Sequence, residues 1–369
     1  MHEGISYVGL DTSKTTIHAA VWIDGQQGYV DEVLPNEGSA VGRFVRKVQR
    51  KAPGKVVFCY EAGPCGYGLQ RQIRELGSEC EVAAPSLIPV KPGERIKTNR
   101  RDARKLAEAL RAGILTMVRP PTPAEEAVRG LCRAREATVS DRHRSRQRAM
   151  KFLLQRGHTW NRGRAWTLSY RRWLHGLVWD HPADQAVFSS LLLAIEQSEE
   201  RLKELELRIL EHSHEAPYRE RVGWLRCFRG IDTITAMTLV TELHGIDRFS
   251  SARALMAYLG MVPSEHSTGT SVRRGRLTCT GNRHARRVLI EAAWNSQRPP
   301  VVRSGLLKRR QGQPAWVLAL ADRAQQRLYR RYRRLTHRGL PPSKVNAALA
   351  RELTGFVWAA LTGPTQTAT

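Results

Sequence analysis

Residues 5–34 read ISYVGLDTSKTTIHAAVWIDGQQGYVDEVL, and this stretch decides the class of the fold. It contains three short runs of apolar and β-branched residues, at 5–10, 16–23 and 28–34, which we predict to be strands. The separating tetrapeptides, DTSK and DGQQ, have the composition of turns. Three consecutive strands joined by short turns are most simply paired as a meander.

Helices and strands alternate in the residues that follow. A helix is predicted at 39–51, and residues 55–60 (KVVFCY) form an apolar run typical of a central strand. A helix at 66–76, a strand at 79–84 and a helix at 98–112 are expected next. The sequence therefore predicts a mixed α/β domain, which we assign to residues 1–119.

A long helix is predicted directly after this domain. Pro120 and Pro121 mark the boundary, and the residues TPAE that begin at Thr122 form a capping-box signature with proline at the first helical position. The helix should continue to about Arg156, where Gly157 ends it. Its many arginines surround it, so we expect it to lie against nucleic acid, although a solvated helix would carry the same pattern.

A second long helix is expected from Pro182 to about His212, with a weak heptad pattern of apolar residues. It can pair with the first long helix as an antiparallel hairpin, or with its counterpart in a dimer. The tryptophan-rich connector at 160–179 can stack bases or form a small core. We assign residues 120–219 to a long-helix, coiled-coil region and residues 220–369 to a mostly helical C-terminal domain, so the fold class is α/β plus all-α.

The charge of the chain indicates its partner. It has 60 Lys and Arg against 34 Asp and Glu in 369 residues, which gives a net charge of +26 and a pI near 10.7. A polyanion such as nucleic acid is the expected partner. No apolar run approaches the roughly 20 residues of a spanning helix, and the N-terminus lacks a signal-peptide pattern. We therefore expect a soluble, cytoplasmic protein that does not enter a membrane.

Three acidic residues lie at the ends of predicted strands or near the start of a predicted helix, where carboxylates can bind a metal ion. Asp11 ends the first predicted strand, Glu61 ends the fourth, and Asp102 lies near the start of a helix. This order of elements and acids is similar to that of RNase H-like or RuvC-like folds, in which such carboxylates hold Mg²⁺ for phosphodiester chemistry. Each residue also has a structural alternative: a turn, a solvated strand end, or a favourable charge at a helix N-terminus.

A loop near the C-terminus, within residues 258–287, has the composition of a phosphate-binding segment. Small hydroxyl residues and Gly269 are followed by basic residues. Glycine lets the backbone come close to phosphate, and guanidinium groups pair with it. The arginines are Arg273, Arg274, Arg276, Arg283, Arg286 and Arg287. A flexible polar loop that merely contacts nucleic acid is the alternative. Upstream, residues 225–243 resemble a helix-hairpin-helix with Asp232 in place of its second glycine.

Several motifs resemble those of one known family. They are YVGLDTSK at 7–14, YEAGPCGYGL at 60–69, KTNRRDARKLAEALRAG at 97–113, YLGMVPSEHSTG at 258–269 and TGNRHARRVLIEAAW at 280–294. Together they are similar to the insertion-sequence transposases of the IS one-ten (IS110) family, in its IS eleven-eleven subgroup. The resemblance covers essentially the whole chain, and motifs this long in this order are highly specific.

The resemblance implies a function. Members of that family are DEDD-type, RuvC-like recombinases with a second catalytic domain that carries a serine nucleophile. They use a structured non-coding guide RNA, the bridge or seek RNA, to select target and donor DNA. They work as homodimers that assemble into a tetramer. By resemblance we therefore expect an RNA-guided recombinase that needs Mg²⁺ and makes a serine–DNA intermediate.

The resemblance also implies site residues. The family's acids fall on Asp11, Glu61 and Asp102, while its remaining acid falls on Asn99, which brings an amide oxygen but no charge. The serine directly before glycine in many relatives aligns with Thr268, while Ser267 matches the S-S-G and S-T-G versions of the motif. We assign the nucleophile to Ser267, because a primary hydroxyl is the less hindered nucleophile, and keep Thr268 as the alternate. Two other functions are open: a Holliday-junction nuclease that uses only carboxylates and water, and a catalytically decayed nucleic-acid-binding protein.

Overall fold

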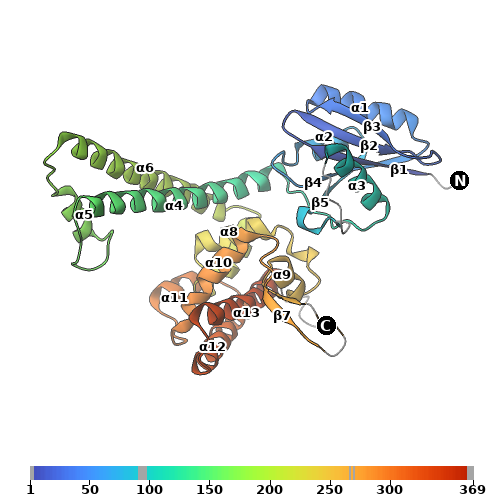
Figure 1. Ribbon diagram of the computed structural model, residues 1–369. Coiled ribbons are helices and arrows are strands. Elements are labelled where there is room, and N and C mark those ends of the chain that lie inside the picture. The colour runs from blue at the N-terminus through green and yellow to red at the C-terminus, as the bar shows by residue number, and fades with distance from the viewer. Residues whose placement is uncertain (1–3, 90–97, 266, 269–270, 364–369) are drawn as a thin grey trace. The chain divides into compact units, whose positions relative to one another are not determined.

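The chain forms two compact units, divided between Pro121 and Thr122. Figure 1 shows a mixed sheet and its helices in the first unit, and mostly helices in the second. No helix among the described residues is long and apolar enough to cross a membrane. The computed structural model describes residues 4–89, 98–265, 267–268 and 271–363.

The first unit is built on one five-stranded sheet with the strand order β3-β2-β1-β4-β5. β1 pairs antiparallel with β2, and β2 with β3, as the predicted meander requires, whereas β1–β4 and β4–β5 are parallel. The strands are β1 (Ile5–Thr12), β2 (Thr16–Trp22), β3 (Val30–Pro35), β4 (Lys55–Glu61) and β5 (Glu79–Ala83). The helices are α1 (Gly38–Lys51), α2 (Gly68–Glu75), η1 (Pro85–Leu87) and α3 (Asn99–Arg111).

Helices cover both faces of this sheet. Because side chains alternate along a strand, Val8 and Phe58 lie on one face and pack in a core with α1 and α2. Tyr7 and Cys59 lie on the other face, where Leu106 of α3 joins their cluster. The predicted mixed α/β domain is confirmed at the level of its elements.

α3 approaches the sheet closely at Gly9. A Cβ atom placed there would lie 2.1 Å from the carbonyl oxygen of Ala103 and 2.5 Å from the nitrogen of Ala107. Only glycine allows such an approach of helix to strand. Further along the helix, the guanidinium of Arg111 lies over the ring of Trp22, 4.7 Å from its centroid. α3 is thus held against β1 and β2 along most of its length.

The second unit is predominantly helical, as the sequence predicts for the C-terminal part. Its two short strands, β6 (Pro263–Glu265) and β7 (Arg274–Leu277), pair antiparallel in the arginine-rich loop. Its helices are α4 (Pro123–Gln155), α5 (Leu168–His175), α6 (Pro182–Ser213), α7 (Tyr218–Arg226), α8 (Thr233–Leu243), η2 (Ile246–Arg248), α9 (Ala252–Tyr258), α10 (Arg283–Ala293), η3 (Trp294–Gln297), α11 (Ser304–Arg310), α12 (Ala315–His337) and α13 (Pro342–Thr362).

α4 begins at the predicted capping box. Thr122 accepts from the backbone nitrogen of Glu125, whose carboxylate accepts from the backbone nitrogen of Thr122. Reciprocal bonds of this kind satisfy two donors that a helix start otherwise leaves free. The predicted start of the long helix is confirmed.

α4 and α6 pair as an antiparallel hairpin, one of the two arrangements left open by the sequence (Figure 1). Ion pairs cross between them in reverse order along the two helices. Arg135 Nη2 lies 2.6 Å from Glu206 Oε1, and Arg146 Nη2 lies 2.5 Å from Glu199 Oε1. Partly exposed pairs of this kind contribute about 0.2–1 kcal/mol each, so they fix the register more than they stabilise the hairpin.

An aromatic cluster closes the far end of this hairpin. Trp160, Trp173 and Trp179 pack around Tyr170 and the buried Phe152. The rings of Trp160 and Tyr170 meet edge to face at 5.5 Å between centroids. Aromatic pairs in this geometry add about 0.5–1.5 kcal/mol beyond area burial. The tryptophans of the connector therefore form a small core, one of the two interpretations that the sequence left open.

Candidate active site

Asp11 and Glu61 lie side by side at one edge of the sheet. Leu10 of β1 is the register partner of Tyr60 of β4, so the residues that follow each of them stand at the same level of two parallel strands. Gly9 of β1 and Cys59 of β4 both contact α3. Asp11 and Glu61 stand two positions further along the same strands, so they lie on the same face of the sheet as α3. Asp11 is half-buried and Glu61 is exposed.

α3 runs antiparallel to β1 and brings its first turn to this edge. Arg111, at its end, lies over Trp22, which pairs with Tyr7 near the start of β1. Ala103 lies over Gly9, which is further along the strand. Asp102 therefore lies towards the end of β1 that carries Asp11. Asn99, one turn earlier, shares a helix face with Asp102 and is exposed.

The first turn of α3 is also held by an acid that sequence reasoning missed. Asp31 of β3 accepts from Arg104 Nε at 2.8 Å and from Arg100 Nε at 2.5 Å. The hydrogen bond from Arg104, opposed by burial and aided by Arg100, lowers the pKa of the Asp31 carboxyl below its usual value. The arginines of the run NRRDAR at the start of α3 were an available signal, but their partner lies some 70 positions upstream.

The acids supply the atoms that Mg²⁺ prefers, although their three carboxylates do not form one cluster. Asp11, Glu61 and Asp102 carry carboxylates, and Asn99 carries an amide oxygen; hard divalent cations bind such oxygen donors. Asp102 Oδ1 lies 3.4 Å from Lys105 Nζ, its neighbour on the next turn. Within the described ranges, no three His, Cys, Asp or Glu side chains form a group that could hold a metal ion.

Ser267 lies in the loop between β6 and β7 of the second unit. Its hydroxyl donates to Glu265 Oε1 at 2.8 Å and accepts from the backbone nitrogen of Arg273 at 3.3 Å. A carboxylate that accepts from a hydroxyl is placed to take its proton. Arg274 Nε lies 3.7 Å from the other oxygen of Glu265. His266, which the sequence also places beside Ser267, lies outside the described residues, as does Gly269.

Thr268 has a different environment. Its backbone nitrogen donates to the carbonyl oxygen of Ser271 at 3.1 Å, and the nitrogen of Ser271 donates back at 3.0 Å. This pair of bonds forms an isolated bridge at the tip of the loop. Both residues are exposed. Of the two candidate nucleophiles, Ser267 is the one whose hydroxyl donates to a carboxylate.

Two glycines hold the stem of this loop together. Gly260 and Gly281 have φ values of +62° and +69°, which are strained for other residues. A Cβ at Gly281 would lie 1.8 Å from the carbonyl oxygen of Tyr258, and one at Gly260 would lie 2.4 Å from the nitrogen of Thr280. The chain segments that enter and leave the loop therefore meet at backbone contact distance, which fixes its base.

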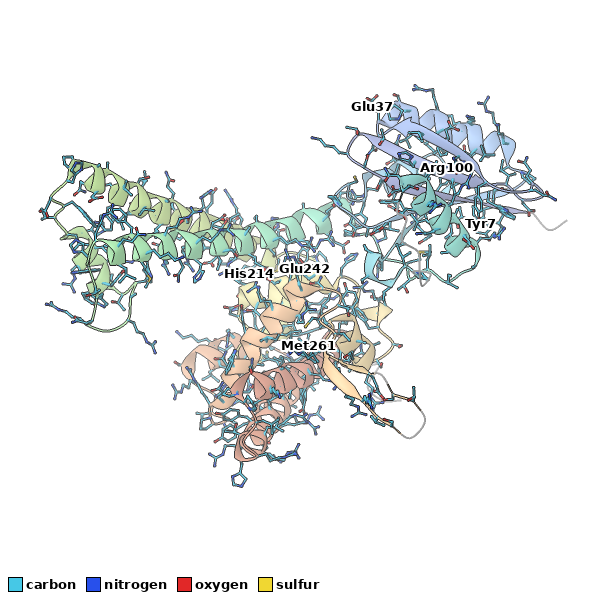
Figure 2. The ribbon with its side chains drawn as sticks, in the orientation of Figure 1. Tyr7, Glu37, Arg100, His214, Glu242 and Met261 are labelled. Carbon is cyan, nitrogen blue, oxygen red and sulfur yellow. The ribbon has the colours of Figure 1, made fainter. Side chains whose placement is uncertain are left out.

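Glu242 of α8, which is labelled in Figure 2, anchors the helix that follows the loop through hydrogen bonds. This nearly buried carboxylate accepts from Arg133 of α4 at 2.6 and 2.8 Å, and from the side chain of Asn282 at 2.6 Å. Burial acts to raise the pKa of Glu242, but the bonds from Arg133 and Asn282 lower it below its usual value overall. Asn282 also caps α10 by accepting from Ala285. The loop base, α8 and α4 are thus tied together.

The predicted phosphate-binding arginines fall into two sets. Arg286 donates to the carbonyl oxygens of Leu259 and Thr280, and Arg287 pairs with Glu136 and Glu291. These two brace the protein itself. The other four side chains are exposed, and they are Arg273, Arg274, Arg276 and Arg283.

Two stretches of the chain match families of known proteins. Residues 8–157 match the family described as "Transposase" of the DEDD IS110 type, and residues 224–304 match the "Transposase IS116/IS110/IS902 family". The chain is 42% identical over 356 residues, 96% of its length and 88% of the relative's, to the "Putative transposase y4qE" of Sinorhizobium fredii (strain NBRC 101917 / NGR234). It is 35% identical over 343 residues, 89% of its length and 96% of the relative's, to the transposase for insertion sequence element IS1533 of Leptospira borgpetersenii.

Proposed function

The chain belongs to the IS116/IS110/IS902 family of transposases and is a DNA recombinase of an insertion sequence, and from that premise we propose that Ser267 becomes covalently joined to DNA during strand exchange. The single observation that carries this proposal is the hydrogen bond from the Ser267 hydroxyl to Glu265. A serine hydroxyl is a poor nucleophile until a neighbouring group accepts its proton.

In the proposed step a phosphoryl group of the DNA backbone moves from a DNA oxygen to the oxygen of Ser267. The oxygen of Ser267 attacks a backbone phosphorus of DNA, Glu265 takes the hydroxyl proton, and the bond from phosphorus to the departing DNA oxygen breaks. That oxygen leaves as a DNA hydroxyl after it gains a proton. A free DNA hydroxyl later reverses the reaction on the second strand, so the exchange conserves bond energy and needs no high-energy cofactor.

The carboxylate edge of the first unit is the proposed Mg²⁺ site. Asp11, Glu61 and Asp102 would hold the ion, with Asn99 as a neutral fourth ligand, and a bound Mg²⁺ would neutralise charge that develops on the phosphate. Support comes from the shared strand level of Asp11 and Glu61 and from the direction of α3. The same arrangement supports a RuvC-like fold for this unit. DEDD transposases usually use a divalent metal.

A guide RNA and target and donor DNA are the proposed partners. The resemblance suggests the RNA, and the net charge of +26 supports a polyanionic partner. One groove, about 490 Å³, is lined by residues of α4 and α10. Four of them are Arg135, Arg142, Arg144 and Arg146, and the acids Glu136 and Glu291 also line it. Arginine on a helix surface suits the phosphates of a folded RNA.

Self-association through the long helices is the proposed assembly. Leu193 and Leu207 stand two heptads apart on α6 and are 53% and 54% exposed. Apolar side chains repeated at that interval form a seam for another helix. A homodimer built on this coiled-coil seam, which pairs again into a tetramer, would bring together units from different chains.

The test of the nucleophile compares two neighbouring alanine variants. Ser267→Ala is expected to bind RNA and both DNAs as the wild type does, yet to form no protein–DNA adduct that survives denaturant. Thr268→Ala should still form the adduct, because its hydroxyl is not the attacking group. Labelled DNA that migrates with the denatured protein on a gel is the measurement.

Two results would contradict the assignment. An adduct that persists in Ser267→Ala and vanishes in Thr268→Ala would move the nucleophile by one residue. Free DNA ends without any adduct in an active wild type would instead support a nuclease that uses only the carboxylates and water. Binding measured on the same preparations controls for misfolding.

A further inference from the structure

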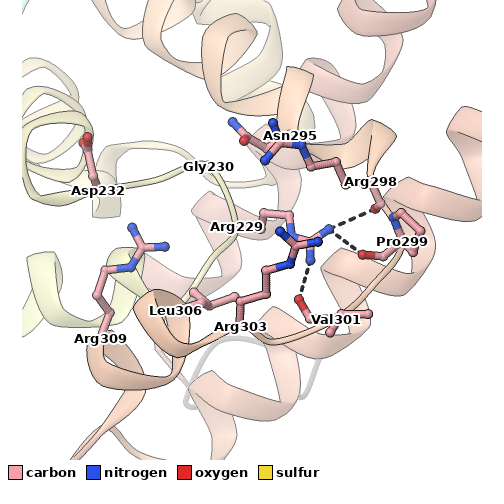
Figure 3. A pocket seen from close by; sticks show the side chains of 10 residues that line it. All are labelled: Arg229, Gly230, Asp232, Asn295, Arg298, Pro299, Val301, Arg303, Leu306 and Arg309. Carbon is pink, nitrogen blue, oxygen red and sulfur yellow. Dashed lines mark hydrogen bonds between the residues drawn. The ribbon is translucent and has the colours of Figure 1, made fainter. Parts of the chain in front are cut away.

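A cavity of about 480 Å³ opens beside the turn between α7 and α8 (Figure 3). One wall is the turn itself, with Arg229 and Asp232. The other walls are Arg298, in the segment after η3, and Arg303 and Arg309, at the two ends of α11. None of these residues belongs to the carboxylate edge, which carries Asp11, Glu61 and Asp102. None belongs to the loop between β6 and β7 that carries Ser267, which we call the serine loop. We call this cavity the arginine pocket.

The charge of the arginine pocket is strongly positive. Four guanidinium groups line it, against one carboxylate, that of Asp232. That carboxylate already caps α8, where its oxygen accepts from the backbone nitrogen of Thr235 at 2.8 Å. The four cations therefore face the cavity with little compensation from the protein.

Arg229 is fixed in the pocket wall without an acidic partner. Its guanidinium donates to the carbonyl oxygens of Arg298 at 2.9 Å and Pro299 at 2.7 Å, and also to that of Val301 (Figure 3). Among the described residues, no carboxylate pairs with it. Burial, together with the positive charges of Arg303 and Arg298, lowers the pKa of Arg229. An anion in the cavity would relieve that repulsion.

Arg309 has a hydrogen-bond donor that a ligand could use as well. One of its terminal nitrogens donates to the carbonyl oxygen of Ile231 at 2.9 Å. Its Nε is buried and has no hydrogen-bond partner within the part of the chain that the structure describes. A buried donor left unsatisfied is destabilising, so a bound acceptor would be stabilising there.

Arg298 and Arg303 complete the site at its mouth. Both side chains are exposed, and neither has an ion-pair partner among the described residues. Their forked guanidinium groups suit the oxygens of a phosphate. Among the described residues that line the cavity, none has an aromatic ring on which a base could stack. The lining therefore favours an anionic group over a nucleobase.

We propose that the arginine pocket binds a backbone phosphate of a nucleic acid, with Arg229 and Arg309 as the fixed floor and Arg298 and Arg303 as the clamp. The identity of the polymer rests on the proposed function, since a transposase that follows a guide RNA handles both DNA and RNA. The pocket itself rests on the geometry and charge given above. It adds a contact point separate from the serine loop.

The first experiment removes the clamp and leaves the floor intact. The double variant Arg298→Gln/Arg303→Gln is compared with Arg333→Gln/Arg338→Gln, which removes two exposed arginines outside the pocket and lowers the net charge equally. Binding of single-stranded DNA and RNA of one sequence is measured by fluorescence anisotropy over a salt series. The clamp variant should lose about tenfold in affinity and lower the log–log salt slope by about 1. The control should change both values much less.

The second experiment makes the electrostatic potential of the pocket more positive by removing its carboxylate. Asp232→Asn keeps a good helix cap, because Asn and Asp serve equally at that position, and removes the pocket's one carboxylate. It should bind the same polymers more tightly, and inorganic phosphate should compete more effectively than with wild type. Its melting temperature shows whether α8 is intact.

The outcomes separate the pocket from the serine mechanism. Weaker binding of both polymers supports a shared phosphate contact, and weaker binding of one identifies that polymer as the occupant. Equal losses in the clamp and control variants, or an unchanged affinity in Asp232→Asn, would overturn the proposal. Neither result bears on adduct formation by Ser267, which is measured independently on pre-bound DNA.

Discussion

Asn99 stands one turn before Asp102 on α3, where the family resemblance places an acid. Restoring that charge with Asn99→Asp should tighten the dependence of strand transfer on Mg²⁺, because a carboxylate is a stronger ligand than an amide for a hard cation. A titration of activity against Mg²⁺ should then reach half-maximum at about one-tenth of the wild-type concentration, since about 1.4 kcal/mol of extra binding free energy is tenfold in affinity.

The control for this change adds a charge elsewhere. Gln27→Glu places one carboxylate in the exposed turn between β2 and β3, at the opposite end of β2 from the partner of Asp11. It should leave the titration unchanged. A titration that is the same in Asn99→Asp and wild type would argue against Asn99 as a ligand.

Some single residues could be found from sequence and others could not. Asp11 and Glu61 were placed at strand ends, and parallel pairing of those strands brings them to one level. The bond from Ser267 to Glu265 depends on the shape of a loop, which composition does not specify. Arg287 was grouped with the phosphate-binding arginines because its partner, Glu136, lies about 150 positions away. Long-range ion pairs leave no local signal.

The attachment of α3 to the sheet gives a prediction at the scale of the element. Asp31→Asn removes the carboxylate that binds Arg100 and Arg104, and it should lower the free energy of unfolding by about 1 kcal/mol at neutral pH. Because the folded-state pKa of Asp31 is lowered, its contribution is fully present above the unfolded pKa, near 3.8, and is lost as pH falls through the folded pKa.

Urea unfolding at several pH values measures this effect. The difference between wild type and Asp31→Asn should be constant from neutral pH to about 5 and should shrink below about 4. Asp24→Asn, a half-buried acid in the turn after β2 with no ion pair among the described residues, is the control. A difference that does not depend on pH would show that Asp31 acts through packing alone.

Secondary structure was predicted well where local chemistry specifies it. The strands of the first unit follow from alternation, and α4 follows from its capping box. The small β6–β7 hairpin was missed, because β7 reads RGRL and has no apolar alternation. The choice between a hairpin and a dimer for α4 and α6 depended on ion pairs between the two helices, which heptad spacing does not reveal.

The net charge of +26 gives a prediction for the whole molecule. Binding to DNA or RNA should weaken linearly on a log–log plot against salt, with a slope of about −0.9 for each phosphate neutralised on duplex DNA. Anisotropy titrations over a range of salt concentrations test this, with melting curves at each salt to exclude unfolding. A flat dependence would mean that the basic surface does not contact the nucleic-acid backbone.

Catalysis that uses both proposed centres would require assembly. The carboxylate edge belongs to the first unit and Ser267 to the second. Under the proposed function, these units must meet on the same DNA, from one chain or from two. If they come from two chains, activity would rise with the concentration of the assembled complex, and a chain bound alone to DNA would remain inert.

The close approach at Gly9 bears on how copies of an insertion sequence lose mobility. The atoms that a Cβ there would strike are backbone atoms of Ala103 and Ala107, which cannot rotate aside as a side chain can. Even alanine would push the helix that carries Asn99 and Asp102 away from Asp11. A copy of the element could therefore lose its mobility through the single carbon that Gly9→Ala adds, at a residue that takes no part in the chemistry. A survey of conserved acids alone would still count that copy as active.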